Sequence, residues 1–159
     1  MPEVRWATEE DAPQLAAILM VMADHYRQEP IEPARALASA RQWLQSGREE
    51  EPHFAMAFAG NAAVGLASVS IAYPGGNLAR LLLLKDLFVT AGARGQGVGR
   101  ALVVFLARYC RDNGIGRIDL STPDWNTGAI AFYEGLGAVR RSEPVFLRFT
   151  ADVLSKLVD

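Results

Sequence analysis

Apolar residues recur with two different periods along this chain, and each period predicts a different kind of element. Leu15, Ile18, Leu19 and Met22 are three or four positions apart, which is the spacing of one helix face. The same spacing returns in later segments, one of which has Pro33 near its first turn. The pattern therefore predicts four helices, over residues 12–25, 33–45, 97–113 and 126–136.

Shorter apolar segments bounded by turn-forming residues predict strands instead. Gly60-Asn61 and residues 74–77 predict tight turns, so the three strands around them are expected to form an antiparallel meander. A strand–helix–strand crossover after them predicts one parallel pair. The predicted strands cover residues 3–7, 53–59, 63–73, 78–89, 117–121, 139–141 and 145–150. Together they predict an α+β fold in one domain, 1–159, with a mixed, mostly antiparallel sheet of about seven strands and helices on both faces.

Composition and charge exclude several classes of protein. Half of the 159 residues are apolar and 21% are charged, as in soluble globular domains. A net charge of -2 gives no basic field for nucleic acid, and no apolar run is long enough to span a membrane. Cys110 is the only cysteine, which excludes an internal disulfide and a cysteine-based zinc site and suits a reducing cytoplasm. We therefore expect a cytoplasmic protein with no nucleic-acid, membrane or metal partner.

The stretch from Leu81 to Gly99, LLLLKDLFVTAGARGQGVG, carries the strongest functional signal. A strand, a glycine-rich turn and a helix start follow one another there, which presents backbone N–H groups to phosphate oxygens. The turn lacks the Gly-Lys-Ser/Thr of a P-loop, and the spacing of Gly95, Gly97 and Gly99 differs from the G-x-G-x-x-G of dinucleotide-binding folds. Two interpretations of the glycine-rich turn are left: it binds phosphate in another way, or it binds nothing.

Two motifs carry a resemblance to a known family. Arg94-Gly95-Gln96-Gly97-Val98-Gly99 resembles motif A of the GCN5-related N-acetyltransferases (GNAT), Q/R-x-x-G-x-G/A, which binds the pyrophosphate of acetyl-CoA. Residues 124–138, DWNTGAIAFYEGLGA, resemble motif B of that family, N-x-x-A-x-x-F-Y-x-x-x-G-F/A. The order of the predicted elements agrees with the GNAT fold over essentially the whole chain. Asp86-Leu87-Phe88-Val89 and Trp125-Asn126 make it similar to the diamine (spermidine/spermine and thialysine) acetyltransferase branch.

The resemblance implies acetyl-CoA as the acyl donor, no metal, and several residue roles. The backbone of Leu87 and Val89 is expected to bind the pantetheine arm, and residues 95–100 the diphosphate. Tyr133 is the expected general acid that protonates the leaving thiolate, with a plain core aromatic beside Phe132 as the alternative. The expected cofactor-binding residues are Leu87, Phe88, Val89, Arg94, Gly95, Gln96, Gly97, Val98, Gly99, Arg100, Asn126 and Ala129.

A proton acceptor is also needed, because an alkyl ammonium with a pKa of about 10.4 is no nucleophile at neutral pH. The diamine branch carries a glutamate where this chain has Lys85, and a cation cannot take that proton. Asp86 is then the best catalytic candidate, although an ion pair with an arginine would explain a carboxylate in this strand equally well. Strand alternation predicts Asp86 on the face of Leu84 and Phe88, opposite Lys85, unless a bulge intervenes.

The other candidates belong to segments expected to line the acceptor site. His25 at the end of the first helix and Glu143 near the last hairpin are further candidate bases, the alternatives being an exposed histidine and a plain loop residue. The expected substrate-binding residues are His25, Tyr26, Lys85, Trp125 and Glu143. Cys110 is expected to be a small buried thiol.

These features predict an N-acetyltransferase that moves an acetyl group from acetyl-CoA directly to the primary amine of a small molecule, diamine-like or amino-acid-like. A non-catalytic acyl-CoA-binding module is the alternative that Lys85 motivates. An acetyltransferase of protein N-termini or lysines is the other alternative. A homodimer is expected because related enzymes commonly dimerise.

Overall fold

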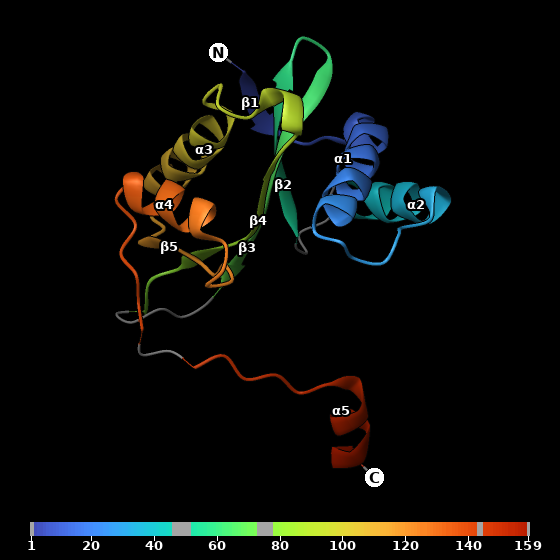
Figure 1. Ribbon diagram of the computed structural model, residues 1–159, viewed down its shortest axis with the longest axis vertical. Coiled ribbons are helices and arrows are strands. Elements are labelled where there is room, and N and C mark those ends of the chain that lie inside the picture. Colours follow the sequence, from blue (N-terminus) through green and yellow to red (C-terminus); the bar gives the residue numbers. More distant parts are fainter. Residues whose placement is uncertain (1, 46–51, 73–77, 143–144, 159) are drawn as a thin grey trace. The chain divides into compact units, whose positions relative to one another are not determined.

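The structure of the protein, a computed structural model, describes residues 2–45, 52–72, 78–142 and 145–158. Its internal contacts divide the chain into two compact units, Met1–Ser121 and Thr122–Asp159. Within the described residues, the first unit contains one five-stranded sheet with helices α1, α2 and α3, and the second contains helices α4 and α5 (Figure 1).

The sheet of the first unit has the strand order β1-β2-β3-β4-β5. Its strands are β1 Glu3–Trp6, β2 His53–Ala59, β3 Ala62–Ala72, β4 Leu81–Val89 and β5 Arg117–Leu120. The first four strands pair antiparallel with their neighbours, and β5 lies parallel to β4. The predicted mixed, mostly antiparallel sheet is therefore confirmed, including the parallel pair made by the crossover through α3.

The sheet has five strands where the pattern predicted about seven. Residues 139–141 and 145–150 are irregular, and no strand of the described residues pairs with them. A short segment rich in apolar and aromatic residues favours an extended backbone, but a strand also needs a partner for its N–H and C=O groups. The residues after them form a helix, α5 Ala151–Val158.

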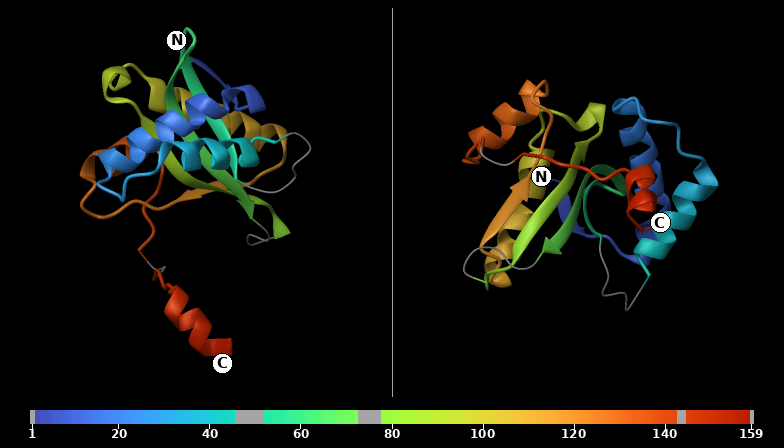
Figure 2. Two further views of the ribbon diagram at one scale, coloured as in Figure 1. Left: turned by 90° about the vertical axis from the view of Figure 1, so that its right-hand side faces the viewer. Right: turned by 90° about the horizontal axis from the view of Figure 1, so that it is seen from below.

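Helices cover both faces of the sheet, as predicted. Helices α1 Ala12–His25 and α2 Pro33–Trp43 lie on one face, and α3 Val98–Asp112 lies on the other (Figures 1 and 2). Short 3-10 turns, η1 Glu9–Asp11 and η3 Ala91–Ala93, precede α1 and follow β4.

Each face packs through its own set of side chains. On the face covered by α1 and α2, called here the α1–α2 face, one apolar cluster joins helix and strand residues: Ala12, Leu15, Ala16, Ile18, Ala36, Ala40, Phe54, Met56, Phe58, Leu66 and Phe88. On the opposite face α3 lies close against β3 at Gly65, where a Cβ would sit 2.8 Å from Cγ1 of Val98 and 3.1 Å from Cδ1 of Leu102. Only a residue without a side chain fits this contact unless the helix shifts.

In the second unit, α4 spans Thr127–Gly135. Asn126 caps it: the side-chain oxygen accepts a hydrogen bond from the backbone N–H of Ala129 at 3.2 Å. Motif B of the sequence therefore begins at a helix N-cap and continues along the helix.

Candidate active site

A β-bulge in β4 decides which face of the sheet carries Asp86. Leu84 lies opposite Val69 on β3, and Asp86 lies opposite Ser68. Lys85 is therefore an extra residue with no partner of its own on β3. Without that extra residue, every side chain of β4 beyond it would point to the other face.

The bulge places Asp86 on the α1–α2 face. Residues opposite one another in a ladder project to the same face, and Phe88 lies opposite Leu66, both within the α1–α2 cluster. Asp86 shares this face with Phe88, while Leu84, on the far side of the bulge, projects to the α3 face. The exception named in the prediction, a bulge, is thus present, and it separates Asp86 from Leu84 while leaving Asp86 on the face of Phe88.

The carboxylate of Asp86 has two different neighbours. The hydroxyl of Ser68 donates a hydrogen bond to Oδ2 at 2.6 Å, and Nζ of Lys85 lies 3.7 Å from Oδ1. The Lys85 side chain is 73% exposed and that of Asp86 31% exposed. The alternative explanation of this carboxylate is an ion pair with an arginine; the ion pair present is with an exposed lysine, and the Asp86 side chain remains partly exposed.

An aromatic cluster joins the end of α1 to the end of β4. The ring of His25 lies 5.0 Å from that of Tyr26 and 5.7 Å from that of Phe88, measured between centroids. Nη2 of Arg94 lies 3.4 Å from Nε2 of His25, and its guanidinium lies 5.8 Å from the Phe88 ring centroid. The structure therefore brings His25, Tyr26 and Arg94 to the part of β4 that follows Asp86.

The carboxyl half of β4 has an open edge. β5 pairs only with Leu81–Leu84, so no strand of the described residues lies beside residues 85–89 on that side. The N–H of Thr90 donates to the carbonyl of Val64, and in an antiparallel ladder such bonded pairs alternate with unbonded ones. Leu87 and Val89 fall at the unbonded positions, so their N–H and C=O groups face the open edge, whereas those of Phe88 face β3.

The glycine loop after β4 has the backbone shape of an anion cradle. Gly95 and Gly97 have φ angles of 74° and 80°, a left-handed conformation that residues with a side chain rarely adopt. A Cβ at either position would meet no atom within 4 Å, so space for a ligand exists there. Gly97 is the N-cap of α3, whose first N–H groups have no acceptor within the helix. Residues 95–100 thus fit a diphosphate.

The side chain of Arg94, an expected cofactor-binding residue, has partners within the chain. Its Nε donates to the carbonyl of Val89 at 3.1 Å, and its guanidinium contacts His25. Gln96 likewise donates from Nε2 to the carbonyl of Gly92 at 2.8 Å, which closes the turn. Both side chains hold the loop in shape, and Arg100 follows in the first turn of α3.

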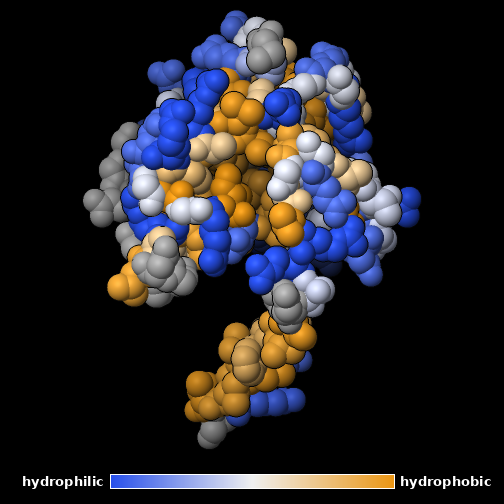
Figure 3. All heavy atoms as spheres, turned by 90° about the vertical axis from the view of Figure 1, so that its left-hand side faces the viewer, coloured by the Kyte–Doolittle hydropathy of each residue, from blue (hydrophilic) through white to orange (hydrophobic). Residues whose placement is uncertain are grey.

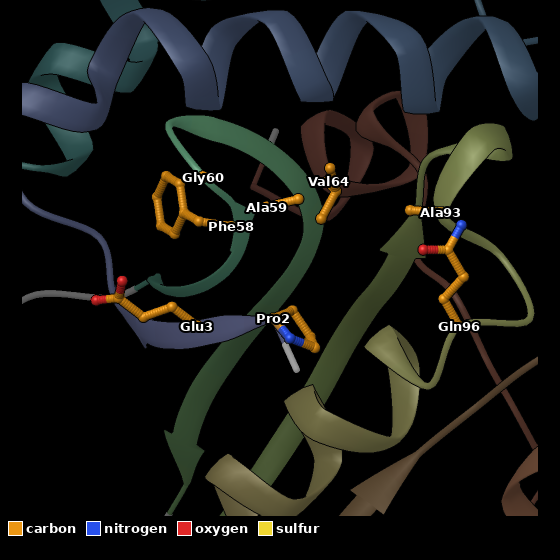
Figure 4. Close-up of a pocket in the computed structure, with 8 residues that line it drawn as sticks. All are labelled: Pro2, Glu3, Phe58, Ala59, Gly60, Val64, Ala93 and Gln96. Atoms are coloured by element: carbon orange, nitrogen blue, oxygen red, sulfur yellow. The ribbon is translucent and has the colours of Figure 1, made fainter.

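A surface hollow of about 380 Å³ lies on the far side of this loop (Figure 4). It is lined by Pro2, Glu3, Phe58, Ala59, Gly60, Val64, Ala93 and Gln96. Gln96 is the only predicted cofactor-binding residue in this lining, and neither Asp86 nor the aromatic cluster contributes to it. The hollow is therefore separate from the predicted acid–base residues.

The second unit carries the residues of motif B. Tyr133 is half-buried on α4, its ring 5.1 Å from that of Phe132 in an edge-to-face arrangement. Trp125, just before the helix, is 70% exposed. At the start of the helix the backbone N–H of Ala129 donates a hydrogen bond to Oδ1 of Asn126, so this side-chain oxygen is already used to cap the helix.

Four further observations bear on the predictions. Glu143 lies outside the described residues. Cys110 is buried, as predicted, and burial raises the pKa of its thiol. Among the residues that the structure describes, no three or more His, Cys, Asp or Glu side chains gather to hold a metal ion. No described helix has the length and apolarity needed to cross a bilayer.

Sequence reasoning missed Ser68. Its side chain is buried, and the structure connects it directly to the best candidate base. The sequence shows only a serine in an apolar strand, and the pairing register needed to connect it with Asp86 is not a local property.

Comparison with protein families and with curated proteins gives one consistent result. The model of the Acetyltransferase (GNAT) family matches residues 16–138. Thialysine N-epsilon-acetyltransferase of Caenorhabditis elegans is 26% identical over 160 residues, which cover 99% of this chain and 97% of that protein. L-ornithine N5-acetyltransferase NATA1 of Arabidopsis thaliana is 34% identical over 74 residues, 46% of this chain and 32% of that protein. The chain thus spans about one third of the length of that plant relative.

Solved structures share the fold. An integron cassette protein from the mobile metagenome of Vibrio cholerae superimposes with a TM-score of 0.85 at 24% identity, covering 99% of this chain and 97% of that one. The aminoglycoside N-acetyltransferase AAC(6')-Iy in complex with CoA has a TM-score of 0.75 at 20% identity, covering 94% and 95%. At these identities the likeness concerns the fold.

Proposed function

The chain belongs to the GNAT family of acetyltransferases, and we propose that it transfers an acetyl group from acetyl-CoA to the primary amine of a small molecule. The proposal rests on three backbone features that follow one another along the chain. The open strand edge at Leu87 and Val89 is followed by the left-handed glycine loop and then by the N-terminus of α3. An extended arm that ends in a diphosphate suits that sequence of features.

The residues that would hold acetyl-CoA follow from this geometry. When bound, the cofactor supplies an activated acetyl thioester. The outward N–H and C=O groups of Leu87 and Val89 bind its amide-containing arm as a neighbouring strand would. The N–H groups of residues 95–100 bind the diphosphate, and Arg100 adds positive charge. The N–H of Leu87 is also the donor available to polarise the acyl carbonyl.

Asp86 is the proposed general base. Its side chain lies on the α1–α2 face, is partly exposed, and shares that face with Phe88, two residues along the strand, whose ring contacts His25. An incoming ammonium is attracted to a carboxylate and to aromatic ring faces, and the carboxylate then removes its proton. Nζ of Lys85 lies 3.7 Å from Oδ1 of Asp86. Because this lysine side chain is exposed, the ion pair is weak, and the substrate ammonium replaces Lys85 beside the carboxylate.

Tyr133 is the proposed general acid. A phenol hydroxyl donates a proton to the departing sulfur, which makes the thiolate a better leaving group. Motif B supplies this residue at the position where the diamine branch carries its acid, and α4 fixes its backbone.

We propose an amino-acid-like or diamine-like acceptor, as named for the relatives that act on thialysine and ornithine. A free-thiol assay with acetyl-CoA and a panel of diamines, amino acids, aminoglycosides and lysine peptides tests this. Faster thiol release with ornithine-like amines than with peptides supports the proposal. Tight acetyl-CoA binding without thiol release from any amine would favour the binding module, and preference for peptides would favour a protein acetyltransferase.

We also propose that the protein is a cytoplasmic homodimer that needs no nucleic acid or membrane partner. The single cysteine suits a reducing compartment, and the net charge of -2 gives no general attraction to nucleic acid. Apolar side chains of the second unit, Phe146 and Leu147 among them, are exposed in this chain, and a second copy is the proposed partner that covers them.

A further inference from the structure

We propose that Ser68 is a positioning residue: its buried hydroxyl holds the Asp86 carboxylate in the orientation in which one oxygen accepts the proton of the acceptor amine. The inference rests on the proposed function, since Asp86 is the base of that reaction. It adds a residue on a different strand that acts through Asp86 and touches neither substrate.

The hydroxyl of Ser68 is buried and therefore needs a hydrogen-bond partner. Ser68 is 5% exposed and, with Asp11, one of two buried polar side chains among the described residues. A buried hydroxyl costs free energy unless it is hydrogen-bonded, and Oδ2 of Asp86, 2.6 Å away, takes this bond. A serine side chain has a single χ angle, so a buried serine fixes its hydroxyl at little entropic cost.

The two carboxylate oxygens therefore differ in their freedom. Oδ2 accepts a short, partly buried, charge-assisted hydrogen bond from Ser68. Oδ1 lies 3.7 Å from the exposed Nζ of Lys85, and exposed ion pairs of this kind contribute little free energy. Ser68 thus anchors one oxygen and leaves the other available to a substrate ammonium.

The bulge at Lys85 is what makes this pair possible. It sets Asp86 opposite Ser68; in an unbroken ladder continued from Leu84 and Val69, Asp86 would lie opposite Ala67 and project to the α3 face. One extra residue in β4 therefore places the Asp86 carboxylate on the α1–α2 face, within hydrogen-bond distance of Ser68.

The experiment compares Ser68→Ala, which removes the hydroxyl, with Ser68→Thr, which retains it. Ser70→Ala is the matched control, since Ser70 lies two residues along the same strand opposite Leu83. Three-bond NMR couplings of Asp86 report its χ1 angle in the protein without ligands, and thermal unfolding checks that each variant folds. We expect one χ1 rotamer in the wild type, Ser68→Thr and Ser70→Ala, and averaged couplings in Ser68→Ala.

Steady-state kinetics then tests whether the fixed χ1 rotamer of Asp86 matters for turnover. Ser68→Ala is expected to lower kcat/KM about 10-fold, with Ser68→Thr restoring most of it. In an Asp86→Asn background, itself slower by about 10²-fold, Ser68→Ala is expected to cause no further loss. If the Asp86 couplings are unchanged in Ser68→Ala while Asp86→Asn is slow, the proposed role of Ser68 is wrong but the assignment of Asp86 as the base stands. Wild-type kcat/KM in Asp86→Asn would overturn the base assignment and this inference with it.

Discussion

Two carboxylates of the first unit have opposite surroundings and, accordingly, opposite roles. Asp11 is buried and accepts two hydrogen bonds from the Arg5 guanidinium, at 2.6 and 2.8 Å, and one from the N–H of Thr8 at 2.7 Å. The bond from Arg5 is the main reason why the pKa of Asp11 is lowered from 3.8 to about 2. Asp86 has a partly exposed side chain, and its Oδ1 is paired only with the exposed Lys85. A buried carboxylate held by Arg5 stabilises the fold, whereas the proposed base, Asp86, has only a weak, exposed ion pair for a substrate cation to replace.

The surroundings of Asp11 predict a specific loss of stability in acid. Its pKa is lower in the folded chain than in the unfolded one, so its contribution is complete above about pH 4 and is lost as the pH falls through about 2. Asp11→Asn is expected to lower the free energy of unfolding by about 2 kcal/mol at pH 7 and by much less near pH 2. Urea unfolding at both pH values measures this, with the exposed Asp24→Asn as control. A pH-independent difference would contradict the ion-pair explanation.

Tyr133 gives a prediction that separates its hydroxyl from its ring. Tyr133→Phe keeps the edge-to-face contact with Phe132 and removes only the proposed proton donor. We expect kcat to fall about 10²-fold while the Kd for acetyl-CoA changes little. Tyr109→Phe, whose ring packs on Trp6 in the first unit, is the control. Equal kcat in Tyr133→Phe and the wild type would remove this residue from the mechanism.

At the scale of elements, β4 and the segment after it make most of the proposed site. The amino half of β4 is held between β3 and β5, and the carboxyl half is paired with β3 alone. A strand with one free edge at its end, followed by a turn into α3, presents backbone groups in a line. The proposed binding surface for the cofactor is therefore largely backbone, and side-chain identity matters there where it controls backbone shape.

The conformation of the glycine loop predicts a selective effect on cofactor binding. Gly97 has a φ of 80°, and forcing an L-residue into this region costs about 1–2 kcal/mol. Gly97→Ala is expected to weaken acetyl-CoA binding about 10-fold in isothermal titration, because the loop relaxes away from the left-handed shape. Gly92→Ala is the matched control, since it lies in the same turn without a positive φ and has open space for a Cβ. Similar Kd values for both variants would argue against a role of the loop backbone.

At the scale of the whole molecule, the second unit leaves much apolar surface uncovered. Val145, Phe146, Leu147 and Phe149 are exposed, with Phe146 at 76%. α5 adds Leu154 and Leu157, and Figure 3 shows apolar side chains gathered on this C-terminal helix. Such exposed apolar surface favours association with another chain.

This surface predicts the oligomeric state. Light scattering coupled to size-exclusion chromatography should give twice the chain mass of 17.3 kDa for the wild type. Replacing Leu154 and Leu157 together by serine removes apolar area from α5 and should shift the protein toward the monomer. Lys156→Ser, on the same helix, should leave the dimer intact. A monomeric wild type would contradict the homodimer.

The sequence by itself determined those features that depend on neighbours along the chain. Helix α1 begins and ends at the predicted residues because the period of Leu15, Ile18 and Met22 and the polar residues after them act locally. The left-handed turn at Gly95 and Gly97 was likewise predictable, since glycine is the residue that adopts it without strain.

Only the tertiary structure decided the features that depend on pairing between distant segments. The bulge at Lys85 exists because Leu84 and Asp86 pair with successive residues of β3, and nothing near Lys85 in the sequence specifies that register. The same holds for the partly buried hydrogen bond between Ser68 and Asp86. It also holds for residues 145–150, an apolar segment predicted as a strand that finds no partner among the described residues. Local pattern fixes the conformation that a segment prefers, whereas register and partnership are set by contacts that the pattern does not contain.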